Sequence, residues 1–264
     1  MKRTNQSDCL LCKTNNATQK NSHILPKFVG KTILGAGNAK RGYLFKSSDP
    51  TNPEISQDTD KEDFILCPDC EKYFSYLESY VASSLHNRIR NSALAHEFVE
   101  HSHNGIKWKE CIKMNEFAFR LFIYSIVWRC SVSSVGVWSE FKLDSAEESL
   151  LHSILVSYKH IVLQDCSSIC LKGDEASIPF VFLTAEDFDD KTENAIFANP
   201  SSVNPYHFGF NEYSLFISFN SGLEKTPFVA LINSGLNKIK VGFLTKDLWS
   251  ALQKAIFKRA ANGI

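Results

Sequence analysis

Two Cys-x-x-Cys pairs constrain this chain more strongly than any other feature. Cys9-Leu-Leu-Cys12 stands near the start, and Cys67-Pro-Asp-Cys70 follows after 54 intervening residues. Each pair forms a tight turn that presents two sulfurs, and four thiolates suit a tetrahedral zinc ion. We therefore predict a structural zinc held by Cys9, Cys12, Cys67 and Cys70. The alternative is four buried thiols that bind no metal.

The cellular compartment bears on how these cysteines are interpreted. The first residues are polar and no apolar leader follows them, so we expect a cytoplasmic protein in which thiols stay reduced. The longest apolar block runs from Phe117 to Trp128, which is too short to cross a bilayer, so no membrane association is predicted. The remaining cysteines are expected to be buried thiols: Cys111, Cys130, Cys166 and Cys170.

The composition excludes partners that are selected by bulk charge. The chain of 264 residues has 29 basic and 29 acidic side chains, and its formal net charge is zero. A nucleic-acid partner would have to meet a local basic face rather than a generally basic protein.

Apolar periodicity predicts helices in the first two thirds of the chain. A helix is expected to begin at Pro68, because proline suits a first turn. Residues 113–131 are apolar nearly all round, which is typical of a central helix. Asp144 to Glu148 has the pattern of a capping box and predicts a further helix. By contrast, residues 35–42 and 47–63 have the composition of loops.

The last third of the chain has the pattern of short strands. Strands are predicted at 178–184, 213–219, 228–232 and 238–244, with a hairpin turn at 233–235 joining the last two. Thr245 is expected to cap a final amphipathic helix. The predicted fold class is α+β. It comprises a zinc-stapled finger over residues 1–80, a helical middle over 81–165, and an antiparallel β-rich module over 166–264 that a helix closes.

Residues 7–80 resemble a known superfamily. Between the two cysteine pairs lies Ser22-His23-Ile24-Leu25-Pro26, and Leu66 precedes the second pair. A Cys-x-x-Cys turn, an acidic-His-Ile-x-Pro motif and a second Cys-x-x-Cys that opens a helix occur in this order in HNH endonucleases, the His-Me finger or ββα-metal superfamily. The resemblance implies a treble-clef or ββα-metal finger stapled by zinc.

The resemblance also implies a catalytic centre. His23 would be the general base that deprotonates a water for attack on a phosphodiester of DNA, and a Mg²⁺ or Mn²⁺ ion would stabilise the charge on the phosphate. This chain departs from the family pattern at the carboxylate before the histidine, which is Ser22, and at the Asn or His after the last cysteine, which is Glu71. The middle Asn that orients the histidine has no clear equivalent. Glu71 is therefore predicted as the catalytic metal ligand.

Other interpretations of the same residues remain open. His23 could be a structural residue or a zinc ligand, and the chain would then be an inactive zinc-finger protein that binds nucleic acid or a protein partner. A local phosphate-binding face is predicted at Lys27, Lys31 and Arg41. The resemblance suggests a role in phage defence, and the C-terminal module is a candidate surface for a protein partner. The sequence predicts no oligomeric state.

Overall fold

The computed structural model describes residues 2–29, 42–46, 48–56, 59–103, 105–169, 178–187, 195–198, 205–235 and 238–262. The structure is α+β, as predicted, and the chain divides into two compact units. The helical unit comprises Met1–Phe28, Thr59–Ser92 and Lys113–Ala176. The sheet unit comprises Val29–Asp58, Ala93–Ile112 and Ser177–Ile264. Each unit is assembled from three separate segments, whereas the predicted division has three continuous ones.

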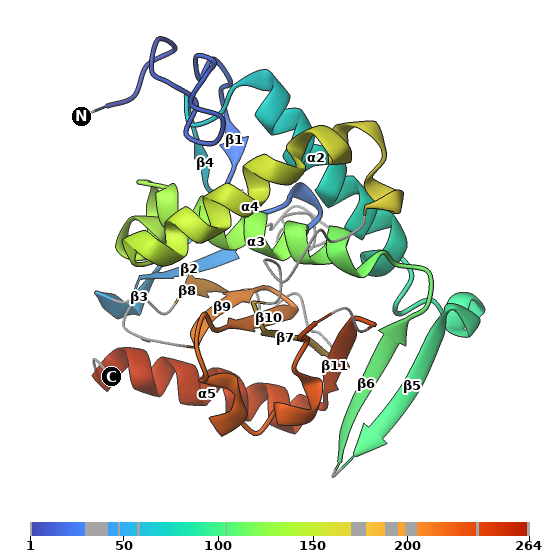
Figure 1. Cartoon of the computed structure of the whole chain (residues 1–264). Coiled ribbons are helices and arrows are strands. Elements are labelled where there is room, and N and C mark those ends of the chain that lie inside the picture. Colours follow the sequence, from blue (N-terminus) through green and yellow to red (C-terminus); the bar gives the residue numbers. More distant parts are fainter. Residues whose placement is uncertain are drawn as a thin grey trace. The chain divides into compact units, whose positions relative to one another are not determined.

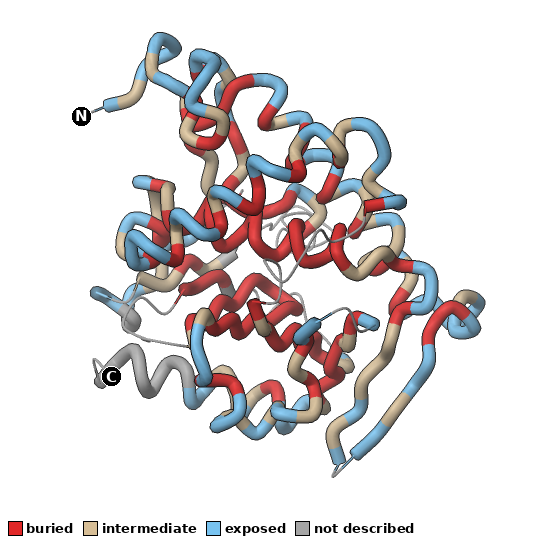
Figure 2. The backbone as a smooth tube through the Cα atoms, in the orientation of Figure 1, coloured by how far each residue is buried: buried red, intermediate tan, exposed pale blue. Residues whose placement is uncertain are grey.

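Three helices form the body of the helical unit (Figure 1). They are α2 (Pro68–Val81), α3 (Glu116–Val132) and α4 (Ser145–Gln164), and each packs against the other two. The predicted starts are confirmed: Pro68 lies in the first turn of α2, and the Asp144 side chain accepts hydrogen bonds from the backbone of Ala146 and Glu147. Helix α3 is buried on nearly every side, as Figure 2 shows, so it is the central helix of this unit.

Short elements complete the helical unit. Strands β1 (Ser22–His23) and β4 (Lys61–Glu62) pair antiparallel, and β4 leads within a few residues into α2. A single π-helical turn (Ala82–His86) follows α2. Two 3₁₀ turns, at Gly136–Glu140 and Cys166–Ser168, also belong to this unit.

The sheet unit contains a mostly antiparallel nine-stranded sheet of order β3-β2-β8-β9-β10-β7-β11-β6-β5. Only the pairs β2–β8 and β7–β11 run parallel among the strands described. The strands are β2 (Gly42–Lys46), β3 (Asp49–Ser56), β5 (Phe98–His103), β6 (Ile106–Cys111), β7 (Phe180–Ala185), β8 (Ala195–Ala198), β9 (Tyr206–Phe210), β10 (Tyr213–Ile217) and β11 (Lys240–Leu244). Further 3₁₀ turns occur at Ser92–Glu97, Leu223–Lys225 and Val229–Leu231.

Helix α5 (Lys246–Asn262) packs on this sheet and confirms the predicted closing helix. Trp249 of α5 joins a buried apolar cluster with residues of β7, β10 and β11, among them Leu183, Phe216 and Leu244. Burial of this apolar surface is the main force that holds α5 on the sheet.

Several sequence predictions of secondary structure are wrong. Residues 98–111, within the predicted helical middle, form the β5–β6 hairpin. The alternation of Ile106 and Trp108 with lysines is a strand signal that the prediction missed, whereas β5 is mostly polar. The predicted loop at 47–63 contains β3, whose two prolines are tolerated because β3 lies at the edge of the sheet. The predicted strand at 228–232 is wrong, because this segment contains a 3₁₀ turn. A short apolar run does not by itself show whether a segment is a strand or a helical turn.

The predicted hairpin at 233–235 does not form between the expected strands. Asn233 pairs with Phe180 at the start of β7, and its side chain binds the backbone of Lys240. Strand β11 pairs instead with β6 and β7. In the part of the chain that the structure describes, no helix combines the length and the apolar character that crossing a bilayer requires.

Candidate metal centre and histidine site

The first cysteine pair lies in a tight turn near the N-terminus. The backbone N–H of Lys13 donates to the Cys9 carbonyl over 2.9 Å, and Lys13 has a positive φ of 55°. The N–H of Leu10 donates to the carbonyl of Ile65 over 2.9 Å. This last bond ties the turn to the segment directly before Cys67.

The second pair lies at the start of α2. Cys67 is the residue before the helix and Cys70 lies in its first turn, so the helix presents both sulfurs toward the N-terminal turn. All four candidate ligand atoms lie within 4.8 Å of one another, and the Cys12 and Cys67 sulfurs are 3.8 Å apart. Bonds of about 2.3 Å from zinc to tetrahedral sulfurs separate those sulfurs by about 3.8 Å. The four cysteines therefore lie close enough to bind a metal ion.

The electrostatics of the four thiols favour a cation. A hydrogen bond from Cys70 lowers the pKa of the Cys9 thiol to about 4. The pKa of Cys70 is raised, because it donates that hydrogen bond and because it is buried. Four thiolates repel one another in a buried site, so all of them ionise together only when a divalent ion compensates their charge.

Helix α4 supports this centre from a distant part of the sequence. The Lys159 ammonium lies 3.2 Å from the Cys70 sulfur, and His152 Nε2 lies 2.7 Å from the Leu11 carbonyl. A Lys beside a cysteine sulfur partly balances the negative charge that four thiolates carry. Neither contact has a signal in the sequence, because both depend on how α4 packs.

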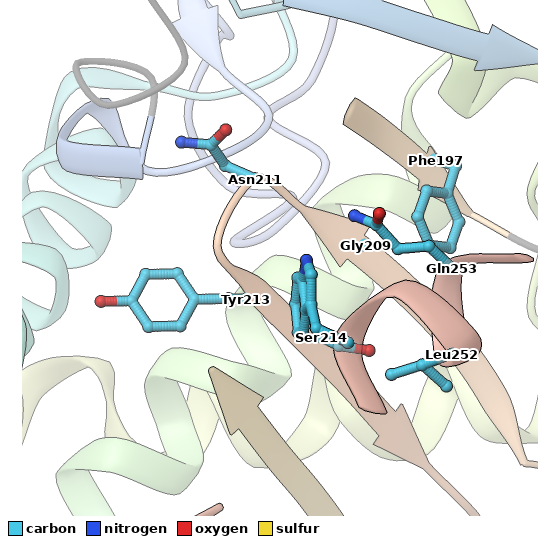
Figure 3. A pocket seen from close by; sticks show the side chains of 8 residues that line it. Phe197, Gly209, Asn211, Tyr213, Ser214, Leu252 and Gln253 are labelled. Atoms are coloured by element: carbon cyan, nitrogen blue, oxygen red, sulfur yellow. The ribbon is translucent and has the colours of Figure 1, made fainter. Parts of the chain in front are cut away.

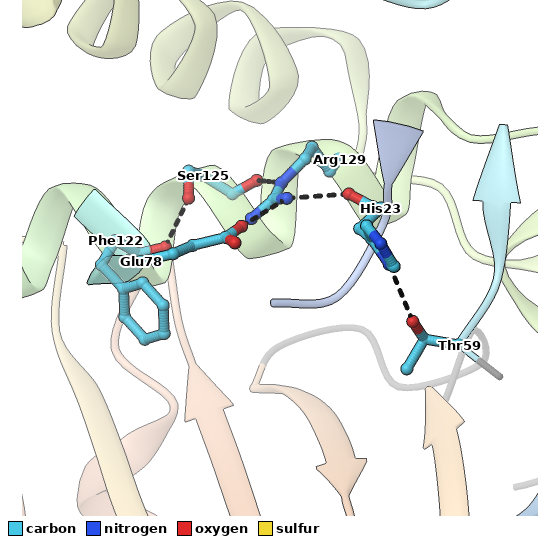
Figure 4. A network of polar contacts seen from close by, with 6 residues as sticks. All are labelled: His23, Thr59, Glu78, Phe122, Ser125 and Arg129. Atoms are coloured by element: carbon cyan, nitrogen blue, oxygen red, sulfur yellow. Dashed lines mark hydrogen bonds and ion pairs between the residues drawn. The ribbon is translucent and has the colours of Figure 1, made fainter. Parts of the chain in front are cut away.

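His23 lies on β1, opposite Lys61 of β4. Its Nδ1 is 3.0 Å from the hydroxyl oxygen of Thr59, which is itself buried (Figure 4). This contact restrains the orientation of the imidazole, and the Thr59 hydroxyl can accept from Nδ1–H in one tautomer or donate to Nδ1 in the other. Thr59 is thus a residue that the sequence analysis missed; no motif distinguishes it from the other polar residues before Lys61.

A buried arginine joins the backbone of His23 to two helices. Nη1 of Arg129, on α3, donates to the His23 carbonyl over 2.8 Å and lies 2.8 Å from Glu78 Oε1 of α2. Its Nε donates to the Ser125 carbonyl over 3.1 Å (Figure 4). The guanidinium carbon lies 5.1 Å from the centre of the Phe74 ring. Strand β1 is thereby held against α2 and α3 at His23.

Glu71 lies in the first turn of α2, next to Cys70. Burial raises the pKa of its carboxyl group, while the Ser22 hydroxyl and the Arg129 charge lower it. Ser22 is fully buried, and its hydroxyl completes no hydrogen bond of ordinary geometry within the described chain. Ser22 and Arg129 thus connect the surroundings of Glu71 to the backbone of β1, whereas the His23 ring contacts Thr59.

The structure does not assemble the rest of the predicted site. Within the described ranges, the four cysteines are the one group of three or more His, Cys, Asp or Glu side chains that is close enough to hold a metal. Of the predicted basic residues, Lys27 is exposed. Lys31 and Arg41 lie outside the described residues, so the predicted phosphate-binding face stays a prediction.

A small pocket in the sheet unit contains none of the predicted site residues. Gly209 and Ser214 line it from β9 and β10, and Leu252 and Gln253 line it from α5 (Figure 3). It has room for about one water molecule, which is too little for a nucleotide or a metabolite. We therefore place the candidate functional site in the helical unit.

Taken together, the fold and the site define an α+β protein whose helical unit has four cysteines close enough to bind a metal ion and a half-buried histidine in contact with Thr59. Comparison with protein-family models, with curated proteins and with solved structures finds no match.

Proposed function

We propose that this chain is a divergent HNH-like, metal-dependent endonuclease that hydrolyses phosphodiester bonds of DNA, with zinc at the four cysteines. One observation carries the proposal: β1 and β4 form an antiparallel pair that leads into α2. His23 lies on the first strand, and the helix carries Cys70 and Glu71 at its start. This order of strand, strand and helix is what the sequence resemblance implies for a ββα-metal finger.

In this proposal His23 is the general base. In it, Nδ1–H donates to the Thr59 hydroxyl, which orients the ring and leaves Nε2 unprotonated to act as the base. Thr59 thus takes the orienting role that the resemblance gives to the missing Asn. The imidazole accepts a proton from a water, whose oxygen bonds to the phosphorus atom as the P–O bond to the leaving oxygen breaks. The leaving oxygen then takes a proton from solvent.

Glu71 is the carboxylate that would hold Mg²⁺ or Mn²⁺, which stabilises negative charge on the phosphate when it is bound. Mg²⁺ keeps several waters and is commonly held by one or two carboxylates together with substrate phosphates. In this proposal Glu71 is the one protein carboxylate on the ion, which agrees with that pattern. The raised pKa of Glu71 marks a carboxyl group whose charge the surroundings do not fully compensate, as is frequent at functional sites.

Plasmid cleavage tests the proposal. Supercoiled DNA is incubated with Mg²⁺ or Mn²⁺ and with the wild type, His23→Ala or His160→Ala; the last removes an exposed imidazole from α4 of the same unit. The wild type and His160→Ala should cut at equal rates, and His23→Ala should lose about 100-fold or more, because a positioned base typically contributes that much. Glu71→Gln should raise the Mn²⁺ concentration that cleavage requires.

Equal cutting by the wild type and His23→Ala, or no cutting by any of the proteins, would sink this proposal. The second candidate would then gain support, namely a catalytically inactive zinc-finger protein that binds nucleic acid or a protein. Ser22 in place of a carboxylate favours this candidate, as does the lack of a second group of three metal ligands in the described chain. DNA retention in a gel-shift assay without cleavage would identify it.

A further inference from the structure

We propose that Arg129 is a positioning residue of the His23 site, which holds the backbone of the histidine against helix α2 and thereby sets where the imidazole points. This inference rests on the proposed function, since it assigns a role within the same site. Arg129 is 106 residues away from His23 in the sequence, and no motif links the two.

The contacts place Arg129 where it can act on the histidine. Its Nη1 is shared between the His23 carbonyl and Glu78 Oε1, each 2.8 Å away. Strand β1 has only two residues and pairs with an equally short strand, so its own ladder holds it weakly. The hydrogen bond from Arg129 therefore adds a restraint on the backbone at His23, beside the bond from the Ile24 N–H to the Asp60 carbonyl and the contact of the ring with Thr59.

The chemistry of the position argues against a purely structural role. Helix α3 is otherwise rich in apolar residues, and Arg129 is only 2% exposed. Its Nη2 is buried and has no hydrogen-bond partner in the described part of the chain. A buried ion pair with an unsatisfied donor is often no more stabilising than apolar residues of similar volume. The arginine is better explained by the geometry that it imposes than by stability.

Lysine cannot reproduce this geometry. The planar guanidinium directs Nε to the Ser125 carbonyl while Nη1 reaches both His23 and Glu78. An ammonium offers its donors from a single atom at the end of a flexible chain. Arg129→Lys therefore keeps the charge beside Glu78 but loosens the hold on His23. Glu78→Gln acts from the other side, because it removes the charge that anchors the guanidinium.

The test uses the full chain and four proteins: the wild type, Arg129→Lys, Glu78→Gln and the control Arg90→Lys, which changes an exposed arginine of the same unit. Zinc content and the melting temperature report on folding. The ¹⁵N chemical shifts of the His23 ring and the kcat and KM of DNA cleavage report on the site. We expect Arg129→Lys and Glu78→Gln to keep zinc and to move the His23 ring resonances. Both should lower kcat roughly 10- to 100-fold and keep KM within about twofold of the wild-type value, because misplacement of a catalytic group slows the chemical step. Arg90→Lys should match the wild type.

The two proposals fail in different ways. A wild type that cleaves no DNA refutes the proposed function, and the ring shifts then decide the role of Arg129 alone. If a folded, zinc-bound Arg129→Lys or Glu78→Gln protein leaves the His23 resonances unchanged, Arg129 is a structural residue only. The same conclusion follows if the wild type is active and both variants keep kcat within about twofold. If Arg129→Lys loses zinc or unfolds, the Glu78→Gln protein alone decides between the two roles by these criteria.

Discussion

Acidification should destabilise the helical unit through His86, which ends the π-helical turn after α2. Its ring centre lies 4.8 Å from that of Phe28, in the segment that continues from His23. Burial, together with the nearby Arg90 charge, lowers the pKa of His86 from 6.5 to about 4. The folded protein thus keeps this imidazole neutral over a pH range in which the unfolded chain protonates it.

The sign and the size of the effect follow from proton linkage. Well above pH 6.5 the residue is neutral in both states and contributes nothing. As the pH falls through 6.5, the unfolded state takes up the proton while the folded state does not, so the free energy of unfolding decreases. The full loss below pH 4 is about 3 kcal/mol, since each tenfold difference in proton affinity is worth about 1.4 kcal/mol. Between pH 7.5 and 5.5 the loss from this residue is about 1.3 kcal/mol.

Urea titrations at pH 7.5 and 5.5 measure this loss. His86→Gln removes the titrating group, so its stability should fall by about 1.3 kcal/mol less than that of the wild type over the same interval. The comparison of two differences cancels the constant cost of losing the contact with Phe28. His160→Gln, the same change at an exposed position, should follow the wild type. Equal pH dependence in the wild type and His86→Gln would refute the reasoning.

Two further predictions concern the metal centre and the sheet. Metal analysis should find about one zinc per chain, and a chelator should unfold the helical unit, because structural zinc contributes about 10 kcal/mol or more to folding. Cys70→Ser should lose the metal, and the control Cys166→Ser should keep it. A stably folded, metal-free protein would contradict this prediction. In the sheet unit, a Cβ on Gly209 would overlap the Phe197 ring, so Gly209→Ala should lower the free energy of unfolding by about 1–3 kcal/mol. An unchanged urea midpoint would show that Phe197 moves aside freely.

Features that depend on local spacing could be predicted from the order of the residues alone. The two cysteine pairs predicted a metal centre because a Cys-x-x-Cys turn brings its own sulfurs together whatever the rest of the chain does. Pro68 and Asp144 predicted helix starts, since capping depends on residues only a few positions apart. The apolar run of α3 predicted a central helix for the same local reason.

Pairing between distant segments was decided only by the tertiary structure. Strand β5 is mostly polar, and pairing with β6 satisfies the hydrogen-bonding groups of its backbone although its composition gives little strand propensity. The interleaving of two units along one chain likewise leaves no trace in composition.

The candidate site divides in the same way. His23 and Glu71 stand in motifs that the sequence displays. Their neighbours Thr59 and Arg129 come from segments 36 and 106 residues away from His23, and only folding brings them into contact with it. A short motif specifies which groups can carry out chemistry, whereas the orientation of those groups depends on contacts that no spacing along the chain encodes.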